Sequence, residues 1–102
     1  MSTNHSYWVY MMSNKTRSVL YIGVTNGLLK RVAQHLAGEV PGFTQQYHCT
    51  HLVYFEQYRN VRDAIAREKQ LKGWRREKKN ALIAKMNPYW KDLAADMLEE
   101  VG

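Results

Sequence analysis

Arg31 and His35 stand four residues apart, in a stretch whose apolar residues recur at helical spacing. At that spacing the two side chains project from one face of a helix, toward whatever the helix covers. Arginine binds anions through a planar fork of donors, and histidine transfers protons near neutral pH. The pair is a candidate for chemistry on an anion, although its spacing alone is also that of an ordinary solvated pair.

Two tyrosines lie in a predicted β-hairpin. The stretches Tyr7–Met12 and Val19–Val24 are rich in aromatic and β-branched residues, and the polar residues 13–18 separate them. A symmetric turn over those six residues sets Tyr10 opposite Tyr21, with both side chains on one face of the sheet. That face is a candidate site, while strand propensity alone also explains both tyrosines as plain sheet aromatics.

A carboxylate on a basic helix is the next candidate. Asn60, followed three residues later by Asp63, is typical of a helix N-terminus, and the apolar spacing predicts a helix from there to about Gly73. Glu68 lies on this helix, and Lys72 follows one turn later. An i,i+4 salt bridge is the ordinary interpretation of such a pair, so spacing alone does not single out Glu68.

Charge is distributed unevenly along the chain of 102 residues, whose net charge is +6. Eleven of the fifteen basic residues lie between residues 59 and 91. The last segment is acidic, with Asp92, Asp96, Glu99 and Glu100. Such a separation predicts a middle segment that binds a polyanion and a terminal segment that packs elsewhere.

A chain of this length has material for one hydrophobic core, so we expect a single domain over residues 1–102. The one cysteine, Cys49, cannot form an intramolecular disulfide, and the apolar run Tyr7–Met12 is too short for a signal sequence or a membrane span. We therefore expect a cytoplasmic protein without membrane contact. His48, Cys49 and His51 lack the second ligand pair of a zinc finger.

Beyond the hairpin, the hydrophobic pattern predicts one more strand and four helices. The first helix, over about 26–37, begins at Thr25 or Asn26 and ends at Gly38, and Pro41-Gly42 opens a loop. The other expected elements are a strand over 52–55, a helix over 60–73, a basic helix from Trp74 to Asn87-Pro88 and an acidic helix over about 89–100.

In order and spacing, these residues resemble a known family. Their pattern is similar to the GIY-YIG nuclease superfamily through Trp8-Val9-Tyr10, Tyr21-Ile22-Gly23, Arg31, His35 and Glu68. The segments that resemble its small stand-alone bacterial members, related to the N-terminal nuclease domain of the repair endonuclease UvrC, are Gly-Phe-Thr at 42–44, Leu-Val-Tyr-Phe-Glu at 52–56 and Arg-Glu-Lys-Gln-Leu-Lys-Gly-Trp at 67–74. The resemblance covers about residues 6–91. Trp8 replaces the first glycine of the family name, and Val24 stands where many members carry a lysine beside the metal.

The resemblance implies an α+β fold with a three-stranded antiparallel sheet flanked by helices. The catalytic residues that it implies are Tyr10, Tyr21, Arg31, His35 and Glu68, with Asn80 as a supporting polar residue. Glu68 would hold one Mg²⁺ or Mn²⁺, mainly through water, because a two-metal site needs a cluster of acids. Arg31 would bind the scissile phosphate, either Tyr21 or His35 would take a proton from the attacking water, and Tyr10 would help to place that water.

The resemblance and the charge together predict a metal-dependent endonuclease that acts on nucleic acid, DNA rather than RNA, with a role in DNA repair. Phosphate contacts are expected from the basic segment, through Lys72, Arg75, Arg76, Lys78 and Lys79. So small a domain offers few base contacts, and a protein partner would supply specificity. The alternative is a nucleic-acid-binding module that keeps the fold with weak or no catalysis. A third class, an interaction domain for an acidic protein, does not require the five catalytic positions.

Overall fold

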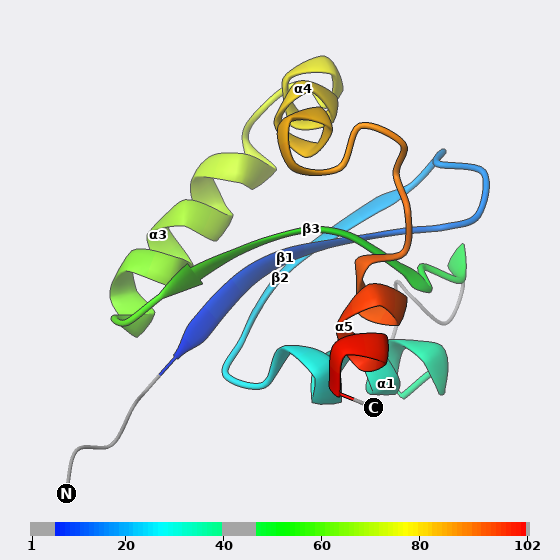
Figure 1. Ribbon diagram of the computed structural model, residues 1–102. Coiled ribbons are helices and arrows are strands. Elements are labelled where there is room, and N and C mark those ends of the chain that lie inside the picture. The colour runs from blue at the N-terminus through cyan, green and yellow to red at the C-terminus, as the bar shows by residue number, and fades with distance from the viewer. Residues whose placement is uncertain (1–5, 40–46, 102) are drawn as a thin grey trace, which may run out of the picture.

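The computed structural model describes residues 6–39 and 47–101 and shows an α+β domain built on one sheet. The strand order β2-β1-β3 places β1 in the middle, and both pairings are antiparallel (Figure 1). The elements are β1 (Tyr7–Ser13), β2 (Leu20–Thr25), α1 (Leu28–Leu36), β3 (His51–Tyr58), α3 (Val61–Lys72), α4 (Arg76–Met86) and α5 (Leu93–Val101). The expected three-stranded antiparallel sheet is confirmed.

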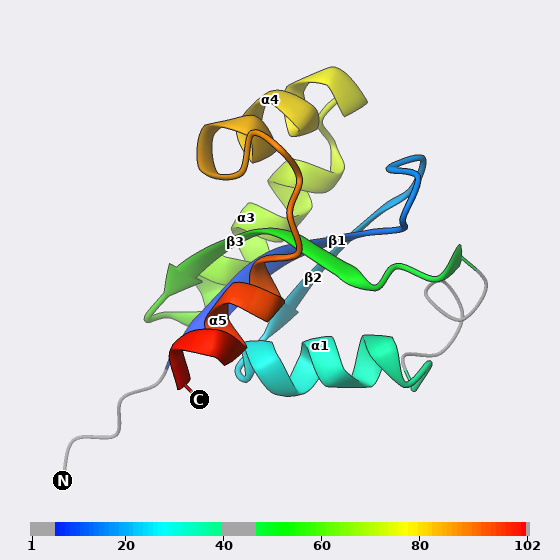
Figure 2. The same cartoon turned by 45° about the vertical axis from the view of Figure 1, so that its right-hand side comes forward.

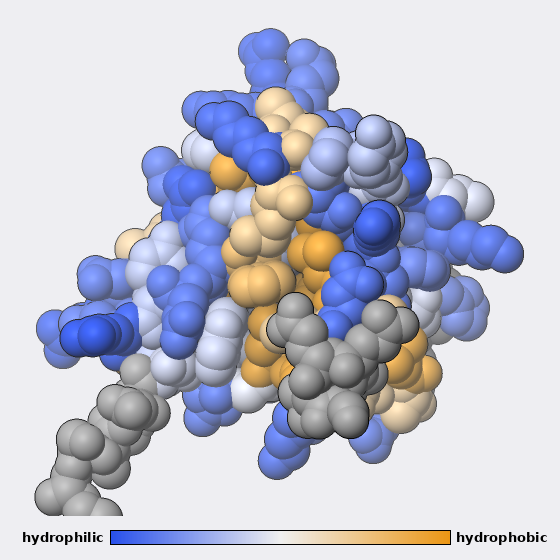
Figure 3. All heavy atoms as spheres, viewed as in Figure 1, coloured by the Kyte–Doolittle hydropathy of each residue, from blue (hydrophilic) through white to orange (hydrophobic). Residues whose placement is uncertain are grey.

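Helices cover both faces of the sheet. One face, here the α3 face, lies under α3 and α4, and the other, here the α1 face, lies under α1 and α5 (Figures 1 and 2). Side chains of β1 alternate between them: Val9 and Met11 belong to the core of the α3 face, and Tyr10 and Met12 to that of the α1 face. All four are fully buried. Hydrophilic residues dominate the surface in Figure 3, and apolar residues appear there as a narrow strip.

The hairpin register differs by two residues from the symmetric turn that the sequence suggested. Tyr10 pairs with Gly23, and Tyr21 pairs with Met12. The expected pairing of Tyr10 with Tyr21 is therefore wrong. Because the side-chain period of a strand is two, this shift leaves both tyrosines on the same face.

The turn itself explains the shift, because Ser13 still belongs to β1 and the connection starts one residue later than expected. Oδ1 of Asn14 accepts a hydrogen bond from the backbone N–H of Val19 at 3.0 Å, and its Nδ2 donates to Oγ of Ser18 at 2.8 Å. Arg17 adopts a left-handed conformation with φ 63°. The side chain of Asn14 thus organises a turn over residues 14–19, one residue later than expected, which composition alone does not reveal.

The two helices that carry the predicted site begin and end close to where the sequence predicts. Gly38, with φ 71°, follows α1, and its N–H binds the carbonyl of His35 while the N–H of Glu39 binds that of Gln34 at 2.8 Å. This is the Schellman arrangement, for which glycine is the favoured residue. Helix α3 begins at Asn60, whose Oδ1 accepts from the N–H of Arg62 at 2.8 Å.

Other boundaries differ from the expectation. Strand β3 extends to both sides of 52–55, α4 begins at Arg76 rather than at Trp74, and the last helix begins at Leu93 rather than at 89. The late start of α5 follows from Asp92, whose carboxylate accepts from the N–H groups of Ala94 and Leu52 and so ties the helix start to β3. The predicted loop segments at Pro41-Gly42 and 42–44 lie outside the described residues. Within the described residues, no helix is long and apolar enough to cross a bilayer.

Candidate active site

Tyr10 is held in the middle of the sheet by a glycine on the neighbouring strand. The Tyr10 side chain is fully buried and lies directly over its partner Gly23. A Cβ atom at Gly23 would lie 2.7 Å from the hydroxyl oxygen of Tyr10 and 2.8 Å from Cζ. Those distances are too short for any side chain, so the close approach requires glycine at this position.

Tyr10, Tyr21 and His35 form a compact group of rings on the α1 face, here called the ring cluster. The hydroxyl of Tyr10 is hydrogen-bonded to Nε2 of His35 at 3.0 Å. Ring centroids of Tyr21 and His35 are 4.9 Å apart at 69°, those of Tyr10 and His35 are 5.6 Å apart, and those of the two tyrosines are 6.0 Å apart. The last turn of α1 thus brings His35 against both predicted tyrosines, as edge-to-face packing favours.

Burial controls the protonation of the ring cluster. It raises the pKa of Tyr10 above its ordinary value, an effect to which Tyr21 adds and which the charge of Arg31 opposes. Burial, and then the charge of Arg31, lower the pKa of His35 to about 4. At neutral pH, Tyr10 therefore keeps its proton and the imidazole is uncharged. Nδ1 of His35 is buried and has no hydrogen-bond partner among the described residues.

Arg31 lies one turn before His35 on α1 and is only half-buried. Its positive charge acts on both Tyr10 and His35, so the guanidinium is close to the ring cluster. In the described part of the chain, no acidic side chain forms an ion pair with it. Among the described residues, no carboxylate therefore offsets the positive charge of this guanidinium.

Glu68 comes from the opposite side of the sheet. It lies on α3, and its half-buried carboxylate is 3.4 Å from Nζ of Lys72. The i,i+4 salt bridge anticipated as the ordinary interpretation is present. Arg31 and Glu68 thus belong to helices on different faces, and their meeting at one site stays a prediction.

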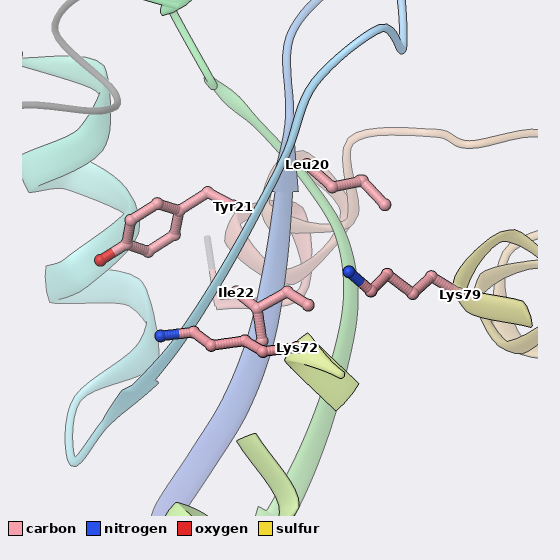
Figure 4. Close-up of a pocket in the computed structure, with 5 residues that line it drawn as sticks. All are labelled: Leu20, Tyr21, Ile22, Lys72 and Lys79. Carbon is pink, nitrogen blue, oxygen red and sulfur yellow. The ribbon is translucent and has the colours of Figure 1, made fainter. Parts of the chain in front are cut away.

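A pocket of about 220 Å³ lies at the edge strand β2, between the ring cluster and Glu68 with its partner Lys72. It is here called the edge pocket. Its lining consists of Leu20, Tyr21, Ile22, Lys72 and Lys79. In Figure 4, Tyr21 extends from one side of β2 toward α1, and the two lysines approach the strand from the side of α3 and α4. The pocket therefore joins a member of the ring cluster to the neighbour of Glu68 around the sheet edge.

The remaining residues of the basic set differ in what they contact. Arg76 donates to the backbone carbonyls of Arg17 and Ser18 and to Oδ1 of Asn80, so its guanidinium fastens the hairpin loop to α4. Asn80 is thus bound to Arg76. Nζ of Lys78 lies 4.1 Å from the ring centroid of Trp74. Arg75 is exposed at the start of α4.

A polar cluster that the sequence did not indicate lies on the α3 face, and is here called the carboxylate network. Both oxygens of Glu56 accept from Arg67, at 2.9 Å for the Nε–Oε1 and Nη2–Oε2 contacts. Tyr58 donates to Oε1 at 2.6 Å, and Tyr54 donates to Oε2. Burial alone raises the pKa of Glu56, but these hydrogen bonds outweigh it and hold the pKa below its ordinary value. The alternation of Tyr54, Glu56 and Tyr58 along one strand is the signal that could have found it.

Residues 6–81 match the family of GIY-YIG catalytic domains. The chain belongs to the GIY-YIG family. Among curated relatives, a UPF0213 protein of Bacillus pumilus is 33% identical over 82 residues, which cover 80% of this chain and 83% of the relative. A UPF0213 protein of Haloquadratum walsbyi is 35% identical over 79 residues, covering 78% and 88%.

A solved structure shares the fold. The solution NMR structure of a UPF0213 protein from Bacillus halodurans superposes with a TM-score of 0.55 and 23% identity, covering 86% of this chain and 93% of that one. The GIY-YIG fold expected from the sequence is thereby confirmed.

The structure explains the need for one glycine of the GIY-YIG pattern. Gly23 is the last residue of Tyr21-Ile22-Gly23, and the ring of Tyr10 occupies the space that a side chain at Gly23 would need. Of the two departures, Trp8 packs beside the core of the α1 face, and Val24 packs against that of the α3 face. Val24 thus contributes apolar contact and no charge. A glycine inside a strand pattern is a sequence signal for close approach, and it could have indicated the position of Tyr10.

Proposed function

We propose that this GIY-YIG protein is a metal-dependent endonuclease that hydrolyses phosphodiester bonds of nucleic acid, with DNA as the substrate. The observation that supports it is the ring cluster beside an arginine that forms no ion pair with any described residue, within a matched catalytic domain. Hydrolysis of a phosphodiester requires a placed water, a proton acceptor and positive charge at the phosphate. The side chains on the α1 face supply the last two and can orient the first.

As a phenolate, Tyr21 is better placed than His35 to take the proton of the attacking water. His35 is 2% exposed, and its Nε2 is already bound to Tyr10. Tyr21 lines the edge pocket. Its ring packs edge-on against the imidazole. In this arrangement Tyr10 and His35 position Tyr21, and the neutral imidazole keeps a repulsive charge away from Arg31.

Arg31 binds the reacting phosphate. A guanidinium can contact two phosphate oxygens at once, and a transition state with more charge on those oxygens is bound more tightly than the substrate. The absence of an ion pair to Arg31 within the described residues means that no carboxylate has to be displaced first.

Glu68 fits a hard divalent cation held mainly through water. No group of three or more metal-ligating side chains occurs in the part of the chain that the structure describes, so a closed protein cage is not offered there. A single partly buried carboxylate, already beside the ammonium of Lys72, is a site that accepts a cation. Glu68 would hold Mg²⁺ or Mn²⁺, which when bound neutralises phosphate charge and assists the departing oxygen.

Cleavage assays with matched acid variants test the proposal. Purified protein is incubated with single-stranded, duplex and branched DNA and RNA, with Mn²⁺, with Mg²⁺ and with chelator, and the products are resolved on gels. We expect metal-dependent cutting of DNA by the wild type. Glu68→Gln should lose cutting, because the neutral amide no longer holds the cation. Its melting temperature and its affinity for DNA should stay nearly unchanged, because the ion pair that it loses with the exposed Lys72 contributes little to stability. Glu77→Gln, which changes an exposed acid on α4, is the control and should cut like the wild type.

Two outcomes would reject the proposal. The wild type could bind DNA and release no product with either metal, or Glu68→Gln could cut as well as the wild type. The first result would favour the alternative, a nucleic-acid-binding module that has kept the GIY-YIG fold. The basic segment would then account for its function through phosphate contacts alone.

A further inference from the structure

The edge pocket contains two ammonium groups supplied by two different helices. Lys72 ends α3 and Lys79 lies on α4, and both side chains reach toward β2 (Figure 4). Lys79 is half-buried, and its ammonium group has neither an ion pair nor a hydrogen bond among the described residues. A partly desolvated cation without a partner is unfavourable, and binding of an anion removes that penalty. The pocket therefore has the charge of an anion site.

We propose that the edge pocket is a phosphate subsite for a nucleic-acid strand, in which Lys72 and Lys79 hold a phosphate next to the reacting one. The location of this subsite next to the reacting phosphate rests on the proposed function. The affinity of the subsite for a nucleic-acid strand does not depend on that function. Leu20 and Ile22 line the same pocket, so the lysine stems have apolar surface to lie on while their ammonium groups face the anion.

The position of the subsite follows from its two neighbours. Tyr21 is both a lining residue of the pocket and a member of the ring cluster. Lys72 is both a lining residue and the ion-pair partner of Glu68. A strand that places one phosphate at Arg31 and continues around the edge of β2 therefore passes the two lysines.

Other basic residues on the same helices have different surroundings. The guanidinium of Arg76 donates hydrogen bonds to the hairpin loop and to Asn80, and Nζ of Lys78 lies over the ring of Trp74. Lys69 and Lys85 are exposed, and neither lines the edge pocket. Lys69 precedes Lys72 on α3, and Lys85 follows Lys79 on α4, so each lysine of the subsite has a matched control on its own helix.

Binding to a fluorescent single-stranded DNA, measured in chelator at several salt concentrations, tests the subsite without catalysis. Lys79→Gln and Lys72→Gln should each weaken binding by roughly three- to tenfold at low salt and reduce the slope of log affinity against log salt by about 0.7, the share of one phosphate on a single strand. Lys85→Gln and Lys69→Gln should change the affinity and the salt slope less than half as much as Lys79→Gln and Lys72→Gln do. Circular dichroism melting verifies that all four variants fold. Equal effects in all four would overturn the subsite.

Two further measurements sharpen the assignment. In amide NMR spectra, the oligonucleotide should shift the signals of Leu20 and Ile22, and inorganic phosphate at the same phosphate concentration should not. Equal shifts would show that the pocket binds free phosphate, and would overturn the proposal that it binds a nucleic-acid strand.

If the wild type cuts, Lys79→Gln should raise KM about as much as it weakens binding and leave kcat unchanged, since the flanking phosphate carries the same charge in substrate and transition state. An unchanged KM would place the subsite away from the reaction. If the wild type does not cut, the salt slopes still decide the subsite by themselves, so the two proposals fail separately.

Discussion

The two faces of the sheet carry similar polar residues, which differ in the hydrogen-bond and ion-pair partners that they have. On the α3 face, the carboxylate of Glu56 accepts hydrogen bonds from Arg67, Tyr54 and Tyr58, and the arginine also donates to Gln70. On the α1 face, a tyrosine and an uncharged histidine share one hydrogen bond, Nδ1 of His35 has no partner in the described residues, and Arg31 has no acid. Tyrosine and arginine thus occur in both clusters, and among the described residues only the arginine of the carboxylate network is paired with a carboxylate.

The difference indicates which face stabilises and which face acts. In a partly buried network whose members are all paired, loss of one member leaves charges or hydroxyls without partners, so the network stabilises the native state only while it is intact. A cluster whose arginine has no carboxylate partner in the described part of the chain gains no ion pair on folding, and that cation can bind a substrate. Stability should therefore depend on Glu56, and activity on Arg31.

The largest effect is expected from Arg31→Ala. Loss of the guanidinium removes charge stabilisation of the transition state, and kcat should fall a hundredfold or more, on the order of 3 kcal/mol. The melting temperature should stay close to that of the wild type, because no ion pair of the described residues is broken. Lys30→Ala, an exposed neighbour on the same helix, should cut normally. An Arg31→Ala protein that unfolds, or that cuts at the wild-type rate, would contradict the expectation that the α1 face carries the activity and the α3 face the stability.

Glu56→Ala should reverse the pattern. Removing the carboxylate leaves Arg67 without its counter-ion and two tyrosine hydroxyls without an acceptor, and we expect a loss of about 2 to 3 kcal/mol in the free energy of unfolding. Urea denaturation followed by circular dichroism measures it, with Glu77→Ala as the exposed control. The kcat of the folded fraction should be unchanged. A large loss of kcat at full stability would mean that the carboxylate network takes part in catalysis.

Local pattern predicted most of the elements, and the resemblance to the GIY-YIG family predicted the members of the ring cluster. The helix ends at Gly38 and Asn60 were predictable because capping residues act on their own neighbours. The hairpin register was not, because the hydrogen bonds of Asn14 to Val19 and Ser18 place the turn one residue later along the chain. Nor was the loss of helix over 89–92, where Asp92 binds the backbone of β3 across the fold.

The roles of charged residues were the least predictable part of the site. Arg76 and Lys79 lie three residues apart and look alike in the sequence, yet one is bound to the hairpin loop and the other lines the edge pocket. Partner choice of this kind depends on which segments the fold brings together, and net charge along the chain says nothing about it. The same reason hid the carboxylate network, whose partners lie on a strand and a helix eleven residues apart.

The buried His35 should make stability fall as pH falls. Its pKa is about 4 in the native state, against an ordinary value of 6.5, so between these values the unfolded chain binds a proton that the native state does not. We expect a loss of about 2 kcal/mol from pH 6.5 to pH 5, a constant contribution above 6.5 and no further change from this group below 4. Urea denaturation across this range measures it, and His35→Gln should remove the slope. The pKa of Glu56, which is lowered from 4.5, affects stability only at lower pH and does not obscure the window. An equally steep decline in the variant would assign the pH response to other groups.

The smallest effect is expected from Cys49, whose thiol on the α1 face the proposed reaction does not use. Its side chain is fully buried in the core that includes Tyr10 and Leu52, and burial raises the pKa of the thiol, so the thiol stays neutral. Cys49→Ser should cost about 1 kcal/mol in the free energy of unfolding because it buries a hydroxyl, and Cys49→Ala should cost a similar amount through a small cavity. Both variants should keep the wild-type kcat once corrected for the folded fraction, which thermal melts and cleavage assays on the same samples determine. A tenfold loss of kcat in the serine variant alone would show that the thiol takes part in the chemistry, and the α1 face would then contain a catalytic group beyond the ring cluster and Arg31.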